Sequence, residues 1–244
     1  MGAPGGQRDI RLGPHIHARC ALASAQPPPT TLQIAEIFAS IQGESLFAGR
    51  PCAFVRLAGC DLGCAWCDTA WAQPRCAGEP MDLDAVLARV LASRLPLVEV
   101  TGGEPLQQPG CVPLLEALLA RGPRVLLETS GAEDVGPVPP GVHVIMDLKA
   151  PGSGVGHRTR WENLDVLGED AELKIVLADR RDYAWAREIL TSRELARRWP
   201  VLLSPIPGRL DPAELAAWML ADRLDARLQL QLHKVLWPGE ERGV

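Results

Sequence analysis

The sequence predicts an α/β fold in which parallel strands form a partial barrel and helices cover its outside. Short apolar or β-branched segments recur along the chain, as expected of strands. Segments in which apolar residues repeat with helical spacing separate them. Strand–helix–strand repetition of this kind indicates a parallel sheet, either open or curled into a barrel. A length of 244 residues suits one large domain.

The predicted strands are short, and several are apolar almost throughout, as in a parallel sheet with both faces covered. They are residues 52–58, 97–101, 124–130, 142–148, 172–178, 200–204 and 227–233. About seven strands are too few for a closed eight-stranded barrel. We therefore expect an incomplete, TIM-like barrel.

The helices are predicted from their apolar spacing and their caps. In residues 82–94, the apolar residues fall on one face of a helix. In residues 211–224, Asp211 suits the N-cap and Pro212 suits the first helical position. Helices are also expected over residues 111–121 and 182–197, and a weaker pattern covers 158–168.

The first part of the chain differs from the rest. Residues 1–31 are rich in Gly, Pro and Ala and contain no apolar block of signal-peptide length. We expect a disordered leader over 1–31 and one folded domain over 32–244. The net charge of −5 and the lack of a bilayer-length apolar run predict no binding to nucleic acid or membrane. Seven cysteines without an export signal indicate a reducing compartment, so we expect the protein to be cytoplasmic.

Three cysteines, Cys60, Cys64 and Cys67, lie close together and indicate a metal site. In one interpretation, they bind a structural zinc with a fourth cysteine, Cys76 or Cys52, in a binding module without catalysis. In the other, they hold three irons of a [4Fe–4S] cluster and leave the fourth iron open to another ligand. The chain has no second C-x2-C and no His-x3-His, which fits the zinc site poorly.

The spacing C-x3-C-x2-C, together with VTGGEP at 100–105, resembles the signature of the radical S-adenosylmethionine (SAM) superfamily. The resemblance implies that the open iron binds the methionine part of SAM. An electron from the cluster then cleaves SAM to a 5′-deoxyadenosyl radical, which requires a reductant such as flavodoxin or ferredoxin. Gly102 and Gly103 lack the Cβ atoms that would keep a ligand away from the backbone.

Four segments narrow the resemblance to one family. They are residues 36–69, 101–105 (TGGEP), 128–131 (ETSG) and 231–238 (QLHKVLWP), and they are similar to the 7-carboxy-7-deazaguanine synthases. The resemblance implies ring contraction of 6-carboxy-5,6,7,8-tetrahydropterin, with loss of ammonia, in the biosynthesis of queuosine and other deazapurines. It also implies regeneration of SAM, a Mg²⁺ ion near the substrate carboxylate, and a homodimer.

The same resemblance implies a role for individual residues, and no side chain is expected to be catalytic beyond the cluster and the cofactor radical. The implied metal ligands are Cys60, Cys64 and Cys67 for the cluster and Thr69 for Mg²⁺. The implied SAM-binding residues are Gly103, Glu128, Ser130, Asp147, Lys149, Ser204, Pro205, Ile206 and Pro207. The implied pterin-binding residues are Ile41, Gln42, Gly43, Glu44, Arg56, Thr101 and His233, the last at the end of the final predicted strand.

Some positions depart from the family pattern. Ser45 follows Glu44 where the family usually has Gly, and Asp61 stands where Asn is common. The chain continues past Pro238 to Val244, so contact between the Val244 carboxylate and the substrate stays open. The alternative within the superfamily is a glycyl-radical activase, which acts on a protein.

Overall fold

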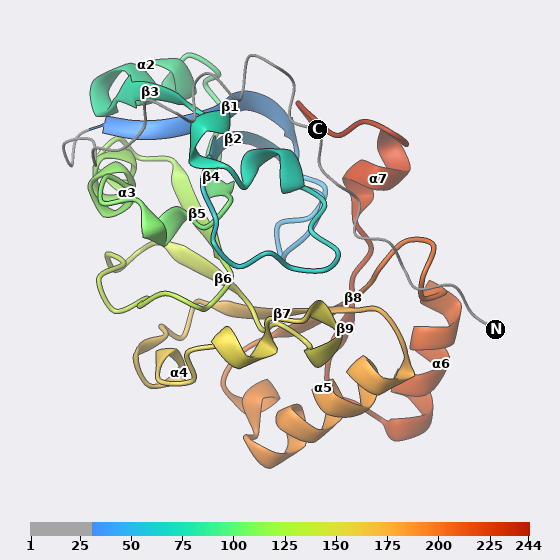
Figure 1. The fold of residues 1–244 in the computed structure, drawn as a ribbon. Helices are drawn as coiled ribbons and strands as arrows, with labels where there is room; N and C mark the ends of the chain where they lie inside the picture. Colours follow the sequence, from blue (N-terminus) through green and yellow to red (C-terminus); the bar gives the residue numbers. More distant parts are fainter. Residues whose placement is uncertain (1–30) are drawn as a thin grey trace.

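The computed structural model describes residues 31–244 and shows one curved, open sheet with helices outside it (Figure 1). Nine strands follow the order β3-β1-β2-β4-β5-β6-β7-β8-β9. They are β1 (Thr31–Ile41), β2 (Pro51–Leu57), β3 (Glu79–Asp82), β4 (Leu97–Gly102), β5 (Arg124–Thr129), β6 (His143–Asp147), β7 (Glu172–Leu177), β8 (Val201–Pro205) and β9 (Arg227–Leu228). β1 is antiparallel to β2 and β3, and from β2 to β9 all neighbours are parallel. The predicted partial barrel is confirmed, because the sheet is mostly parallel and does not close.

All helices but the last lie between strands in sequence and against the outer face of the sheet, and the last helix follows the final strand (Figure 1). They are α2 (Leu83–Leu91), α3 (Cys111–Leu119), α4 (Asn163–Val166), α5 (Arg180–Ser192), α6 (Pro212–Asp222) and α7 (Leu232–Leu236). The predicted cap of α6 is present, since the Asp211 side chain accepts a hydrogen bond from the Ala213 N–H. No helix among residues 31–244 is long and apolar enough to cross a membrane.

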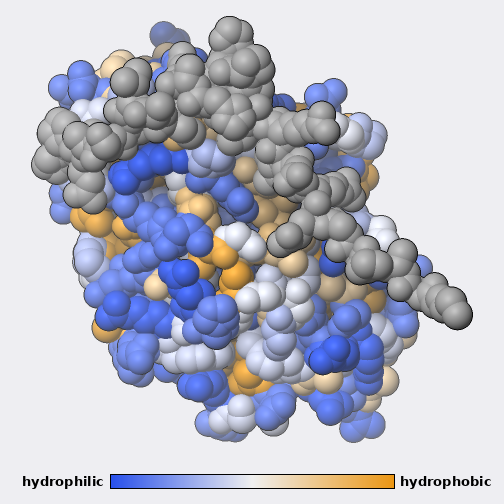
Figure 2. All heavy atoms as spheres, viewed as in Figure 1, coloured by the Kyte–Doolittle hydropathy of each residue, from blue (hydrophilic) through white to orange (hydrophobic). Residues whose placement is uncertain are grey.

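The two faces of the sheet differ because successive strand residues point to opposite sides. Along β4, Val98 and Val100 join the large apolar core beneath the outer helices. Leu97 joins a small apolar cluster on the inner face, and Glu99 and Thr101 follow it there by alternation. On the face seen in Figure 2, the uncovered surface is mainly hydrophilic, with apolar residues in small areas between hydrophilic ones.

Several sequence predictions need correction. The strand predicted over 227–233 is wrong beyond Leu228, because the Leu232 N–H bonds to the Gly43 carbonyl and the chain turns into α7. The helix predicted over 182–197 begins earlier and stops at Ser192, where Glu194 adopts a positive φ of 49°. β1 and β3 were not predicted. The predicted leader lies outside the described residues, except for Thr31, which begins β1.

Candidate active site

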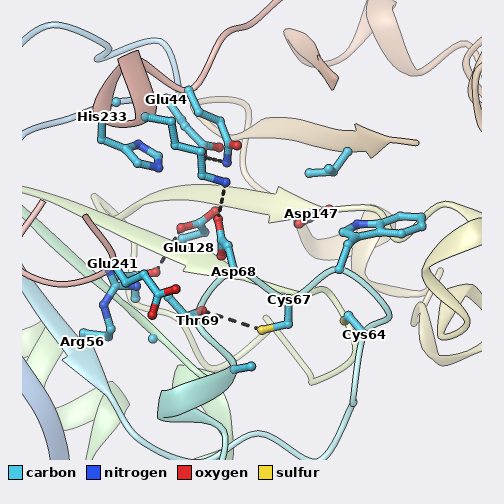
Figure 3. Close-up of a pocket in the computed structure, with 18 of the residues that line it drawn as sticks. Glu44, Arg56, Cys64, Cys67, Asp68, Thr69, Glu128, Asp147, His233 and Glu241 are labelled. Atoms are coloured by element: carbon cyan, nitrogen blue, oxygen red, sulfur yellow. Dashed lines mark hydrogen bonds and ion pairs between the residues drawn. The ribbon is translucent and has the colours of Figure 1, made fainter. Parts of the chain in front are cut away.

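A cavity of about 850 Å³ opens on the inner face of the sheet, at the C-terminal ends of its parallel strands. Every residue that the sequence predicts for the cluster, Mg²⁺ and pterin lines this cavity. The predicted SAM residues line it too, except Ser204 and Pro205, which are buried in β8. The structure therefore gathers segments from the whole length of the domain into one site (Figure 3).

The three cysteines lie on the loop that leaves β2, and backbone hydrogen bonds hold this loop in place. The Gly59 N–H donates to the Ala72 carbonyl at 2.9 Å, and the Ala65 N–H donates to the Ser153 carbonyl at 3.0 Å. The segment from 57 to 69 therefore has its shape set by its neighbours in the protein. It presents Cys60, Cys64 and Cys67 to one cavity.

The thiol set fits a [4Fe–4S] cluster. Each cysteine of such a cluster binds its own iron, and all three cysteines line the same cavity. Burial raises the pKa of the Cys60 thiol to about 11. Burial also raises the pKa of Cys64, although the Lys149 ammonium opposes that rise. Because thiolates are the ligands, iron binding here would release protons.

The zinc interpretation loses one of its two candidate fourth ligands, Cys52. Cys52 is fully buried in the inner apolar cluster with Phe54 and Leu97. It lies near the start of β2, whereas the cysteine loop leaves the far end of the same seven-residue strand. Cys52 therefore cannot complete a zinc site with the loop cysteines. Cys76 lies in a short 3-10 helix, Arg75–Ala77.

The glycine pair at the end of β4 has a packing role that the sequence did not predict. A Cβ atom on Gly102 would collide with the Leu57 backbone, and one on Gly103 would collide with the Gly59 carbonyl oxygen. Gly102 also has a φ of 134°, which side chains rarely adopt. The two glycines thus allow the turn to pack against the backbone of the cysteine loop. The N–H groups of Gly103 and Glu104 donate to the Leu57 and Gly59 carbonyls, each at 2.9 Å.

Glu104, in the same turn, is fully buried and holds the next strand. Its carboxylate accepts hydrogen bonds from the Ser130 N–H at 2.7 Å, the Thr129 hydroxyl at 2.8 Å and the Leu106 N–H at 3.0 Å. The Ser130 hydroxyl donates to it as well. Burial raises its pKa, and the bonds from Ser130 oppose that rise. The hydrogen bonds of Glu104 therefore connect the end of β4 to the end of β5.

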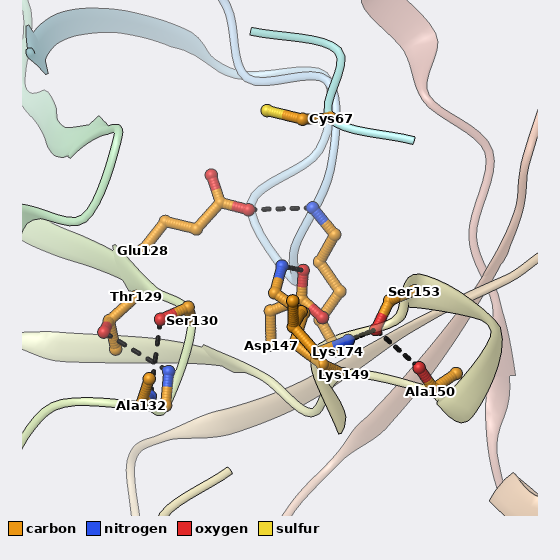
Figure 4. A network of polar contacts seen from close by, with 12 residues as sticks. Cys67, Glu128, Thr129, Ser130, Ala132, Asp147, Lys149, Ala150, Ser153 and Lys174 are labelled. Carbon is orange, nitrogen blue, oxygen red and sulfur yellow. Dashed lines mark hydrogen bonds and ion pairs between the residues drawn. The ribbon is translucent and has the colours of Figure 1, made fainter. Parts of the chain in front are cut away.

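Two predicted SAM residues carry buried polar atoms without a protein partner. Within residues 31–244, neither Oδ1 of Asp147 nor Oγ of Ser204 makes a hydrogen bond. The other Asp147 oxygen accepts from Lys149 Nζ at 2.7 Å (Figure 4). Since buried polar atoms are normally bonded, the Asp147 oxygen on the cavity wall fits contact with a bound ligand, whereas Ser204 does not line the cavity.

The loop after β1 and the C-terminal segment meet on the opposite side of the cavity. The Glu44 N–H donates to the Gln42 side chain at 2.6 Å, and the Gln231 side chain donates to the Glu44 carboxylate at 2.6 Å. The His233 ring packs so closely on Gly43 that a Cβ atom there would collide with it. The predicted position of His233 at a strand end is wrong, because it lies in α7, yet it reaches the cavity.

Comparison with known proteins agrees with this geometry. The radical SAM superfamily matches residues 55–149. The chain is 50% identical over 216 residues to the 7-carboxy-7-deazaguanine synthase of Chlorobaculum tepidum, a match that covers 87% of this chain and 97% of that protein. The chain belongs to the 7-carboxy-7-deazaguanine synthase family.

Another synthase and one solved structure are also similar to this chain. The 7-carboxy-7-deazaguanine synthase of Koribacter versatilis is 44% identical over 229 residues, with all of its length covered. The crystal structure of QueE from Escherichia coli matches with a TM-score of 0.66 and 27% identity, over 82% of this chain and 94% of that one. As a radical SAM enzyme of the synthase family, the chain uses a [4Fe–4S] cluster and SAM.

Arg56 and Thr69 line the remaining wall of the cavity in this synthase-family chain. The Nε atom of Arg56 is 2.8 Å from the Glu36 carboxylate on β1, so its terminal nitrogens are left for another acceptor. Thr69 Oγ1 lies 3.8 Å from Cys67 Sγ. Glu241, from the C-terminal segment, points toward the same region (Figure 3).

Sequence reasoning missed two charged residues in the site, Glu99 and Lys174. Both are buried on the inner face of the sheet and line the cavity. The Gln42 side-chain amide donates to the Glu99 carboxylate. Glu99 stands between two valines in the segment 97–101, and Lys174 stands between Leu173 and Ile175 in the segment 172–178. A charge within a buried strand is the signal that could have found them.

Proposed function

We propose that this chain converts 6-carboxy-5,6,7,8-tetrahydropterin into 7-carboxy-7-deazaguanine and ammonia. The observation that carries the proposal is one cavity that joins the three loop cysteines to the predicted pterin residues. Family membership supports it, because the relatives that cover most of this chain are named for that product. The catalytic domain proposed for this activity is residues 32–244.

The cysteine side of the cavity would hold the cofactors. Cys60, Cys64 and Cys67 would bind the cluster. The turn at Gly103 and the Asp147 oxygen that has no protein partner would contact SAM. When bound, the cluster and SAM together supply a 5′-deoxyadenosyl radical for removal of the hydrogen at C6 of the pterin.

The other side of the cavity would bind and orient the pterin. Gln42 and Glu44 offer an amide and a carboxylate in fixed positions, which suits the amide-like edge of a pterin. Arg56 would take the substrate carboxylate with its terminal nitrogens. Thr101 and His233 would complete the substrate contacts. The buried walls would exclude water from the radical chemistry.

Mg²⁺ would bind beside the substrate carboxylate, with Thr69 as its protein ligand. Support comes from the position of the Thr69 hydroxyl on the cavity wall, beside the cysteine loop and near Arg56 (Figure 3). Mg²⁺ keeps several waters and takes few protein oxygens, so one hydroxyl with substrate oxygens and water is a suitable set.

We also propose an electron donor for the cluster and a second copy of the chain as partners. A one-electron donor such as flavodoxin or ferredoxin would reduce the cluster in the cytoplasm. A homodimer is supported by the open edge of the sheet at β9, where Leu228 and Leu230 are exposed. Light scattering on purified protein should then give the mass of two copies.

Anaerobic reconstitution with iron and sulfide, followed by reduction and mass spectrometry of the pterin reaction, tests the proposal. We expect a brown protein that forms 7-carboxy-7-deazaguanine only with SAM and reductant. A glycyl-radical activase would cleave SAM but leave the pterin unchanged. A zinc module would be colourless and contain zinc without iron, and either result would overturn the assignment.

A further inference from the structure

Lys174 lies at the floor of the cavity, on the inner face of β7 and opposite Asp147 of β6. Its side chain is only 7% exposed. The Nζ atom is 2.7 Å from the Glu128 carboxylate and also contacts the Glu44 carboxylate (Figure 4 shows the contact with Glu128). One buried ammonium therefore joins two acids from distant parts of the chain.

The two acids belong to opposite sides of the site. Glu44 is on the loop after β1 and is held by the Gln231 side chain at 2.6 Å. Glu128 is at the end of β5 and accepts a hydrogen bond from the Thr101 hydroxyl at 3.0 Å. Glu44 is one of the proposed pterin-binding residues, and Glu128 is one of the proposed SAM-binding residues. Within residues 31–244, Lys174 is the group that bonds to both.

The charges around Lys174 depend on one another. Burial alone would lower the pKa of Lys174, but Glu128 and Glu44 outweigh it and raise that pKa well above its usual value. Burial would raise the pKa of Glu128, but Lys174 outweighs it and the pKa falls. Burial raises the pKa of the neighbouring Glu99, and the Glu128 charge adds to the rise. Without the ammonium, Glu44 and Glu128 would face each other in a space that disfavours charge.

We propose that Lys174 is a positioning residue, which holds Glu44 and Glu128 together and so aligns the pterin with the adenosyl group. The inference rests on the proposed function and names a residue that the family resemblance did not. Lys174 touches neither reacting group in this role. It acts through the two carboxylates.

The test replaces Lys174 with Met, which keeps most of the length of the side chain and removes its charge. We expect the Kd for the pterin, measured by calorimetry on unreduced enzyme with SAM, to rise about tenfold or more, since a buried charge pair loses one partner. We also expect more 5′-deoxyadenosine per molecule of product, because the radical forms beside a misplaced substrate. If Lys174 had a purely structural role, Lys174→Met would form less 5′-deoxyadenosine and less 7-carboxy-7-deazaguanine in the same proportion. Arg89→Met, at an exposed position on α2, is the matched control and should change neither reading.

A double-mutant cycle separates action through Glu44 from an independent effect. If Lys174 acts through Glu44, then Lys174→Met and Glu44→Gln together should weaken pterin binding by less than the product of their separate effects. If the two substitutions raise the pterin Kd by the product of their separate effects, the positioning role is overturned. It is also overturned if Lys174→Met leaves both the Kd and the ratio of 5′-deoxyadenosine to product unchanged. Neither result would affect the proposed function. A parent enzyme that neither binds nor converts the pterin would overturn the proposed function and the positioning role with it. If Lys174→Met does not fold, Lys174→Gln takes its place with the same readings.

Discussion

The Glu104 carboxylate accepts a hydrogen bond from the Ser130 N–H at 2.7 Å, and this bond fastens the turn after β4 to the end of β5. Both ends line the cavity, at Gly103 and Ser130. The shape of the site thus depends on a residue that is itself enclosed by protein donors. We therefore expect even a conservative substitution of Glu104 to destabilise the fold.

Glu104→Gln should lower the free energy of unfolding by about 1–3 kcal/mol, because the new amide would point a donor at donors from Ser130. Thermal unfolding followed by circular dichroism measures the change. Glu116→Gln, at an exposed position on α3, should stay within about 0.5 kcal/mol of the parent. Equal stability of the two variants would show that the Glu104 contacts contribute little.

Cys64→Ala should abolish the cluster and all cleavage of SAM while keeping the fold, because backbone bonds hold the loop. Iron analysis, the visible spectrum and circular dichroism measure these three properties. Cys52→Ala is the control: it should keep its iron and lose only stability, since Cys52 is in the inner apolar cluster. Formation of 7-carboxy-7-deazaguanine by Cys64→Ala would rule out the assigned cluster.

Gly103→Ala should disturb the cysteine loop, because its methyl group would collide with the Gly59 carbonyl oxygen. We expect a loss of about 1–3 kcal/mol or more in stability and reduced iron content after reconstitution. Gly168→Ala offers a matched comparison, since a Cβ atom there meets nothing within 4 Å. It should be neutral or slightly stabilising. Full iron content in Gly103→Ala would contradict this account of the turn.

Glu44→Ala should keep reductive cleavage of SAM but weaken turnover of the pterin, because Glu44 lies across the cavity from the cysteine loop (Figure 3). The KM for the pterin should rise by about tenfold or more through the loss of a charged hydrogen-bond partner. Assays of 5′-deoxyadenosine and of product, run side by side, distinguish the two steps. Parent-like turnover would remove Glu44 from the substrate site.

Removal of Mg²⁺ should lower product formation more than it lowers iron content or SAM binding. Thr69→Ala should raise the Mg²⁺ concentration needed for half-maximal rate, since it deletes the proposed protein ligand. Thr191→Ala, on the exposed side of α5, should leave that concentration unchanged. An identical Mg²⁺ dependence in Thr69→Ala and the parent would show that Thr69 is not the ligand.

Much of the fold was predictable because buried parallel strands carry continuous apolar segments. β1 escaped notice because its antiparallel pairing leaves most of its residues only half-buried, without a clear pattern. The segment after Leu228 was misjudged because alternating Leu and Gln residues resemble a strand. At the open edge of the sheet, however, the bond from Leu232 to Gly43 decides the path of the chain.

The site was predictable to a similar extent. Motif resemblance located residues that line the cavity, and the structure adds how they are held. The contacts of Lys174 with Glu44 and Glu128 join residues about 50 to 130 positions apart in the sequence, so no local pattern could reveal them. Glu104 was hidden for a related reason, since its partners Thr129 and Ser130 follow on a different strand.

The backbone bonds of the cysteine loop bear on the order of events during biogenesis. The carbonyls of Ala72 and Ser153 and the turn at Gly103 shape this loop with protein atoms alone. Small zinc domains, by contrast, fold only when their metal binds. We therefore expect the polypeptide to fold before it accepts iron and sulfide, and circular dichroism of the iron-free protein would show this.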